Sequence, residues 1–175
     1  GSETAIIAIT GVSGGSATEN GTQSQTITIT DSLAAPTVTL STSASSVAEN
    51  GSDLTLTATL NRQTFEDVTV TLTGTGTSTA GTDYASLSTI TISAGSTTGT
   101  TTFNPTDDSI YEGSETAIIA ITGVSGGDAT ENATQSETIT ITDSFAAPTV
   151  TLSSSGSSVA ENGSDLTLTA SLNRQ

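Results

Sequence analysis

The chain has 175 residues, 18 of them Asp or Glu and only two Lys or Arg, which gives a formal net charge of −16. This charge excludes nucleic acid as a partner, because phosphates are bound mainly through Lys and Arg. No apolar run approaches the roughly 18 residues of a membrane span, so we expect no membrane insertion in this segment. The sequence contains no His or Cys, which removes zinc sites, disulfides and most nucleophilic triads. We therefore expect a protein that is not an enzyme.

A long internal repeat organises the chain. Residues 1–63 align with residues 113–175 at a shift of 112, with seven differences. Such similarity at a fixed period indicates a tandem array. We predict that residues 36–143 are one complete repeat, that 1–33 are the C-terminal part of a preceding repeat, and that 148–175 are the N-terminal part of a following one. We expect the chain to be a segment of a much longer protein.

Short segments of alternating apolar and polar residues fill the complete repeat. In chain order, the predicted strands cover residues 37–40, 54–60, 68–72, 84–92, 100–103, 117–121 and 138–142. Leu54, Leu56 and Leu60 alternate with Thr, which predicts one buried face and one Thr-rich face. The connections are rich in Gly, Ser and Asn, and no segment has a helical period. This pattern predicts an all-β fold, an Ig-like seven-stranded antiparallel β-sandwich repeated in a tandem array.

The acidic residues of the complete repeat are expected to gather at one end of the sandwich. Successive loops alternate between the two ends, so the first, third and fifth loops and the chain exit share an end. These positions carry Glu49, Asp83, Asp107, Asp108, Glu112, Glu115 and Asp143. We expect no Lys or Arg at that end, and calcium is the hard cation that takes about six to eight oxygen ligands. The alternative is that these acids only keep the loop tips soluble.

The complete repeat contains three distinctive motifs: Val47-Ala48-Glu49-Asn50, then Thr79-Ala80-Gly81-Thr82-Asp83-Tyr84, and finally Asp107-Asp108-Ser109-Ile110-Tyr111-Glu112-Gly113-Ser114-Glu115-Thr116. Together these motifs resemble the Calx-beta domain family. The resemblance covers residues 36–143 and, through the repeat, both partial repeats. It implies a calcium-binding β-sandwich with ions clustered at one end.

The resemblance also implies a set of metal ligands. Glu49, Asp83, Asp107, Asp108 and Glu112 fall where the family places its ligands. The run of acids that follows the last strand in the family's stronger calcium sensors is reduced here to Asp143. The corresponding candidates in the partial repeats are Asp31, the counterpart of Asp143, and Glu161, the counterpart of Glu49. We expect one or two calcium ions per repeat.

Short linkers join successive repeats. Residues 32–36 and 144–148 each end in Pro, which stiffens the chain. The acidic end of one repeat is therefore expected to abut the second and sixth loops of the next. Leu33 or Phe145 is expected either to wedge into this joint or to cover the rim of its own core.

We therefore expect a non-enzymatic calcium-binding structural repeat of a long extracellular, cell-surface protein from a bacterium, forming the rigid stalk of an adhesin or the body of a matrix fibre. Its expected partners are neighbouring repeats of the same protein, with self-assembly into fibres as an extension. An alternative is a module that binds polysaccharide, a partner protein or ice through Thr-rich sheet faces or loop tips. A third reading, a calcium-sensing regulatory domain, is disfavoured by the array and by the reduced acids at the chain exit.

Overall fold

The computed structural model describes residues 2–108 and 110–174. Gly1 and Gln175, at the outer ends of the partial repeats, and Ser109, in the third motif, lie outside the described residues. The part of the chain that is described contains no helix long and apolar enough to cross a membrane.

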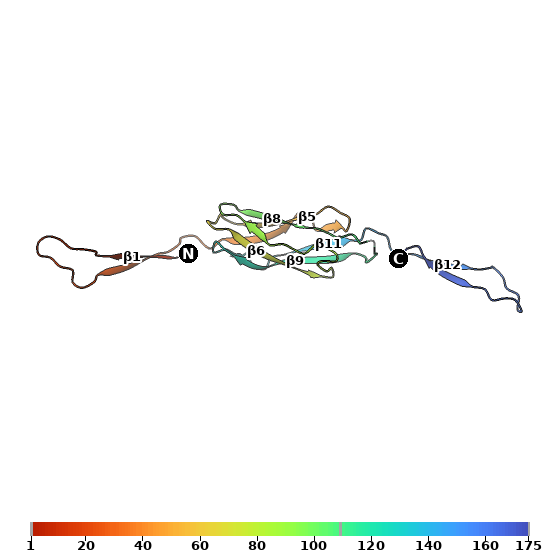
Figure 1. Ribbon diagram of the computed structural model, residues 1–175. Coiled ribbons are helices and arrows are strands. Elements are labelled where there is room, and N and C mark those ends of the chain that lie inside the picture. Colours follow the sequence, from red (N-terminus) through yellow and green to blue (C-terminus); the bar gives the residue numbers. More distant parts are fainter. Residues whose placement is uncertain (1, 109, 175) are drawn as a thin grey trace.

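Two β-sheets form the complete repeat (Figure 1). The four-stranded sheet has the order β10-β3-β5-β8, and the five-stranded sheet has the order β4-β11-β9-β6-β7. In the first sheet the strands are β3 (Thr37–Thr42), β5 (Leu54–Leu60), β8 (Thr98–Phe103) and β10 (Thr130–Glu131). In the second they are β4 (Ser46–Ala48), β6 (Val68–Gly76), β7 (Ile90–Ile92), β9 (Glu115–Ser125) and β11 (Ser136–Thr142). The predicted all-β Ig-like sandwich is confirmed.

The core lies between the two sheets and follows the predicted alternation. Leu54, Leu56, Ala58 and Leu60 of β5 are buried, whereas the Thr residues between them are exposed or half-buried. All buried apolar residues of the described chain lie between Val38 and Ile141. The complete repeat therefore closes its core without a contribution from the flanking segments.

The segment between β6 and β7 differs from the prediction. A strand was expected over residues 84–92, but only β7 forms there, and Tyr84 makes isolated bridges to Ala80 and Pro105. Pro105 follows β8 in the four-stranded sheet, whereas β7 pairs with β6 in the five-stranded sheet. The chain crosses from one sheet to the other between Tyr84 and Ile90, so the intervening residues cannot belong to one continuous ladder.

The sandwich is not wholly antiparallel, because its first and last strands are each divided between the two sheets. β3 pairs in parallel with β10, and β4 pairs in parallel with β11. The remaining ladders are antiparallel, as predicted. β3 and β4 run in the same direction, as do β10 and β11, so this division leaves the predicted alternation of loop ends unchanged.

The partial repeats form hairpins that extend from opposite ends of the sandwich (Figure 1). β1 (Glu3–Ala8) pairs with β2 (Ser24–Ile29) in the register of β9 with β11, and β12 (Val150–Ser154) pairs with β13 (Leu168–Leu172) in the register of β3 with β5. Burial does not follow the pairing: Ile7 is 59% exposed, whereas its counterpart Ile119 is 0% exposed. Strand pairing is thus set locally, while burial requires the second sheet.

Candidate metal centre

Hydrogen bonds tie several loops together at the acidic end. The Glu49 N–H donates to the Thr142 carbonyl (3.0 Å), which places Glu49 beside the chain exit. The Glu112 and Gly113 N–H groups donate to Asp143 Oδ2, at 2.6 and 3.1 Å. The Ser144 hydroxyl donates to Asp107 Oδ1 (2.7 Å). The β8–β9 loop is therefore held against the chain exit, as the alternation of loops predicts.

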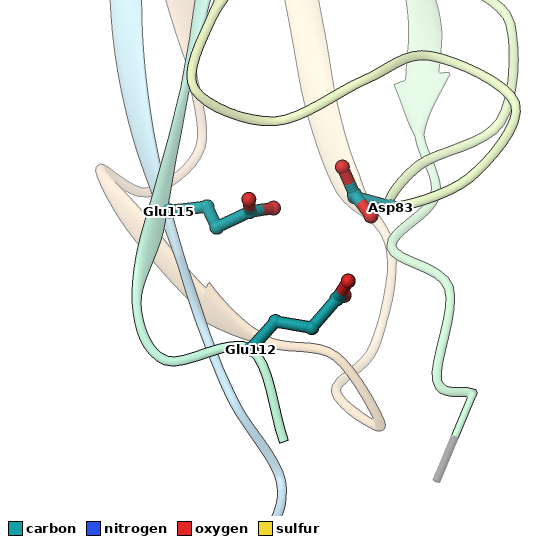
Figure 2. Close-up of side chains that lie close together, drawn as sticks. All are labelled: Asp83, Glu112 and Glu115. Atoms are coloured by element: carbon teal, nitrogen blue, oxygen red, sulfur yellow. The ribbon is translucent and has the colours of Figure 1, made fainter. Parts of the chain in front are cut away.

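Three carboxylates converge at this end. Oxygen atoms of Asp83, Glu112 and Glu115 all lie within 4.8 Å of one another. Figure 2 shows these side chains pointing toward a common space from different parts of the chain. Asp83 comes from the β6–β7 connection, Glu112 from the β8–β9 loop, and Glu115 is the first residue of β9. The tertiary fold alone brings Asp83 to the two Glu residues.

The Asp83 carboxylate is positioned by a turn that is anchored in the core. The Thr79 N–H donates to Asp83 Oδ2 (2.5 Å), and the Thr106 N–H donates to the Asp83 carbonyl (2.9 Å). The neighbouring Tyr84 is buried and stacks on Phe103 with ring centroids 4.8 Å apart. A side chain buried in this way holds the turn in place, and Asp83 itself is buried.

The proximity of the carboxylates changes their protonation. Burial raises the pKa of Glu115 to about 7, helped by the charge of Asp83, by a side-chain hydrogen bond with Asp83, and by the charges of Glu112 and Glu49. The pKa of Glu112 is also raised, by desolvation and then by the charges of Asp108, Asp83 and Asp143. Like charges at short range disfavour the ionised form, and a bound cation would reverse this effect.

Glu49 carries a buried oxygen that needs a partner. Its side chain is only 6% exposed, and Oε2 has no hydrogen-bond partner among the described residues. Burial raises the pKa of Glu49, as do the charges of Asp143, Asp108 and Asp107, while a hydrogen bond from the Ser144 backbone opposes the rise. A buried carboxylate oxygen without a donor is costly, and a cation would satisfy it.

Asp143 differs from its neighbours because it is surrounded by donors. Desolvation acts to raise its pKa, but the N–H groups of Phe145, Glu112 and Gly113, together with the charge of Arg174, leave the pKa below its usual value. The expectation that no Lys or Arg lies at this end is therefore wrong. Arg174 belongs to the following partial repeat, so the cation arrives from the next repeat and could not be found within residues 36–143.

The predicted ligands divide into two groups. Six of them belong to the acidic end of the complete repeat: Glu49, Asp83, Asp107, Asp108, Glu112 and Asp143. Asp31 lies at the other joint, where its carboxylate accepts the Leu33 N–H, and Glu161 is exposed between β12 and β13. Glu115 was missing from the ligands implied by the Calx-beta resemblance, although the alternation of loops had placed it at this end.

The fold and the acidic end define a class of protein, a β-sandwich repeat with a carboxylate-rich tip. The model of the LapA domain family matches residues 34–144, so the chain belongs to that family. No curated protein matches the chain.

Solved structures with the same fold include Calx domains. The apo-form Calx CBD1 domain is 18% identical, with a TM-score of 0.52 over 62% of this chain and 99% of that one. The CBD12 fragment of CALX1.2 is 20% identical, with a TM-score of 0.49 over 56% of this chain and 41% of that one. The calcium binding domain CBD12 of CALX1.1 is 21% identical, with a TM-score of 0.49 over 56% and 40%. The likeness to CBD1 confirms a Calx-beta-like fold.

Proposed function

We propose that the complete repeat binds calcium at its acidic end and serves as a structural segment in the stalk of a long extracellular, cell-surface protein. The observation that carries the proposal is the buried, unpartnered Oε2 of Glu49 in the field of carboxylates from several loops. Asp83, Glu112 and Glu115 would hold one ion. Glu49, with Asp107, Asp108 and Asp143, would supply oxygen ligands for a second.

The chemistry of these groups favours calcium over other metals. The candidate ligands are carboxylates, and the described residues offer no nitrogen or sulfur ligand at this end. Oxygen ligands suit calcium and magnesium, but magnesium demands a nearly ideal octahedron, whereas calcium accepts larger and less regular ligand sets. Carboxylates contributed by loops of different lengths form an irregular ligand set, which suits calcium better than magnesium.

A stalk is supported by the arrangement of the repeats. The chain enters the sandwich at one end and leaves at the other, so the flanking hairpins extend outward in opposite directions (Figure 1). Ions that tie together the loops around Asp143 would also hold the point where the chain leaves for the next repeat. Membership in the LapA domain family is consistent with this role. Association of such stalks into fibres is a natural extension.

The test is thermal unfolding of the chain in excess calcium, in excess magnesium and in chelator. Calcium at about 100 times its dissociation constant should add about 2.7 kcal/mol per site to the free energy of unfolding. We expect a large rise in Tm with calcium and a smaller one with magnesium. Equal melting temperatures in calcium and chelator would show that the acids serve only as solvated loop tips.

A second candidate function is supported by the outer face of the four-stranded sheet. Hydroxyl side chains lie in register across β3, β5 and β8, in the rows Thr39–Thr59–Thr98 and Ser41–Thr57–Thr100. Neighbouring strands are about 4.8 Å apart, so the hydroxyls form a regular lattice. Such a face is suited to polysaccharide, a partner protein or ice. Glycan-array binding or ice-growth inhibition that is lost in Thr57→Lys would favour this function over a purely structural one.

A further inference from the structure

The joint between the first hairpin and the complete repeat contains an open groove. Its volume is about 530 Å³, and it lies at the end of the sandwich opposite the acidic cluster. Leu33 and Ala34 of the linker form one side, and Arg62, Phe65 and Asp128 of the complete repeat form the other. The groove is therefore built by two successive repeats.

Two side chains in this groove have apolar surface or a polar atom without a partner among the described residues. Phe65 is fully exposed, although it is the largest apolar side chain of the β5–β6 loop and its neighbour Thr64 is buried. Arg62 is the only basic residue of the complete repeat, and its buried Nη1 atom has no hydrogen-bond partner among the described residues. An exposed large aromatic beside a guanidinium with one unpaired buried nitrogen indicates a contact surface.

At the joint between the complete repeat and the last hairpin, the counterpart of Arg62 lies beside a complete acidic end. Arg174, the counterpart of Arg62, donates from Nη2 to the Ala146 carbonyl (2.5 Å), and its guanidinium lies 4.8 Å from the centroid of the Phe145 ring. Its charge also acts on Asp143. The following repeat therefore already contacts the linker at the exit of the preceding one.

The acidic end carries apolar side chains that are exposed to solvent. Ile110 and Tyr111 of the β8–β9 loop are 55% and 38% exposed. The same loop is bound to the chain exit because the Glu112 N–H donates to Asp143 and the Ser144 hydroxyl donates to Asp107. These apolar side chains therefore lie on the loop that flanks the linker to the next repeat. The chain contains this loop only once, so the groove at residues 32–36 is seen without it.

We propose that the groove beside Arg62 and Phe65 of each repeat binds the β8–β9 loop of the preceding repeat. Phe65 packs against Ile110 and Tyr111 of that loop, and Arg62 meets the carboxylates at the exit. Arg62 is the single base in the groove, which also holds Glu3, Asp31, Glu66 and Asp128, so the contact rests on the apolar side chains and on Arg62 and not on a difference in net charge. The interface deepens the proposed stalk role and rests on the tandem arrangement, but it does not require calcium.

The test uses a protein in which residues 34–145 occur twice in tandem, since the complete repeat closes its own core. The chain lacks Cys, so Ser41→Cys in both copies provides two unique sites for spin labels on exposed positions. The measured quantity is the width of the distance distribution between the labels. Phe65→Ser in the second copy should broaden the distribution, whereas the same substitution in the first copy, which no repeat precedes, should leave it unchanged.

A mirror experiment tests the other side of the contact. Tyr111→Ser should broaden the distribution when placed in the first copy and have no effect in the second. Each pair of variants carries the same substitution, so an effect on the folding of a single repeat is equal in both members and cancels. Responses that do not depend on the copy, or no response in either, would overturn the proposed interface.

Measuring each variant in calcium and in chelator separates this interface from the metal site. Failure of the calcium proposal appears as identical thermal unfolding in the two solutions. If the interface does not form, the width of the distance distribution between the labels is the same whichever copy carries the substitution. This result does not depend on whether calcium changes the stability.

Discussion

Carboxylate oxygens of Asp83 and Glu115 lie within 4.8 Å of each other, and burial together with the charge of Asp83 raises the pKa of Glu115 to about 7. Two carboxyls this close hold a proton between them more readily than either group alone. If the cluster binds calcium as proposed, a proton and a metal ion would compete for it near neutral pH, with measurable consequences.

Without calcium, the free energy of unfolding should fall as pH rises from about 4.5 to about 7. In this window the folded chain binds more protons than the unfolded chain, because the pKa of Glu115 rises from 4.5 to about 7 on folding. The raised pKa values of Glu49 and Glu112 act in the same direction. The lowered pKa of Asp143 opposes this trend only below its ordinary value of 3.8, so it does not change the sign in this window.

Urea unfolding in chelator, at about pH 5 and about pH 7.5, measures this fall directly. Saturating calcium should abolish it, because the metal holds the carboxylates in their ionised form. A free energy of unfolding that increases over this range in chelator would contradict the prediction.

Replacing Glu49 with Gln should have effects of opposite sign in the two solutions. In chelator the variant should be more stable than the parent, because it removes a buried charge whose Oε2 lacks a partner. In calcium it should be less stable, because a ligand is lost. Thermal unfolding of both proteins in both solutions checks the reversal. Glu161→Gln, at the exposed counterpart position, is the matched control and should change neither value.

Replacing Gly74 with Ala should destabilise the complete repeat. A Cβ atom at Gly74 would lie 2.1 Å from the hydroxyl oxygen of Tyr84, whose ring is buried and stacks on Phe103. Overpacking of this kind typically costs about 1–3 kcal/mol. Urea unfolding should show this loss.

Gly123→Ala is the control for that substitution. Gly123 lies in the neighbouring strand, and its added Cβ would meet nothing closer than 3.8 Å. If both variants lost stability equally, the close approach of Tyr84 to β6 would not be the cause.

Replacing Arg174 with Gln should raise the pKa of Asp143, because the guanidinium of the following repeat contributes to its lowered value. The shift should be small, since the N–H donors of Phe145, Glu112 and Gly113 remain. Carboxyl titration by carbon NMR measures it. The control is Arg62→Gln, which should leave Asp143 unchanged and instead raise the pKa of Asp31. An unchanged Asp143 in the Arg174 variant would show that the following repeat does not act on the acidic end.

Much of this structure could be predicted because both the fold and the cluster depend on simple alternation. The period-two pattern of Leu54 to Leu60 identified a buried face, and counting loops placed Glu49, Asp83, Asp107, Asp108, Glu112, Glu115 and Asp143 at one end. Neither argument requires knowledge of distances.

What could not be predicted depends on contacts between segments. The crossing of residues 85–89 from one sheet to the other depends on Tyr84 pairing with Pro105 while Ile90 pairs with Val70. The charge of Arg174 at the acidic end comes from a different repeat. Glu115 was missing from the ligands implied by the resemblance, and its approach to Asp83 becomes visible only when β9 is placed beside the β6–β7 connection.

The parallel pairing of β4 with β11 has a mechanical consequence. The chain enters the complete repeat before β3 and leaves after β11, at opposite ends of the sandwich (Figure 1). A pulling force along the array would therefore slide β4 and β11 past each other, and the hydrogen bonds from Ser46–Thr140 to Ala48–Thr142 would share the load together. A ladder loaded in shear resists far better than one that opens bond by bond. We therefore expect each repeat to resist a pulling force, chiefly through the pairing of β4 with β11.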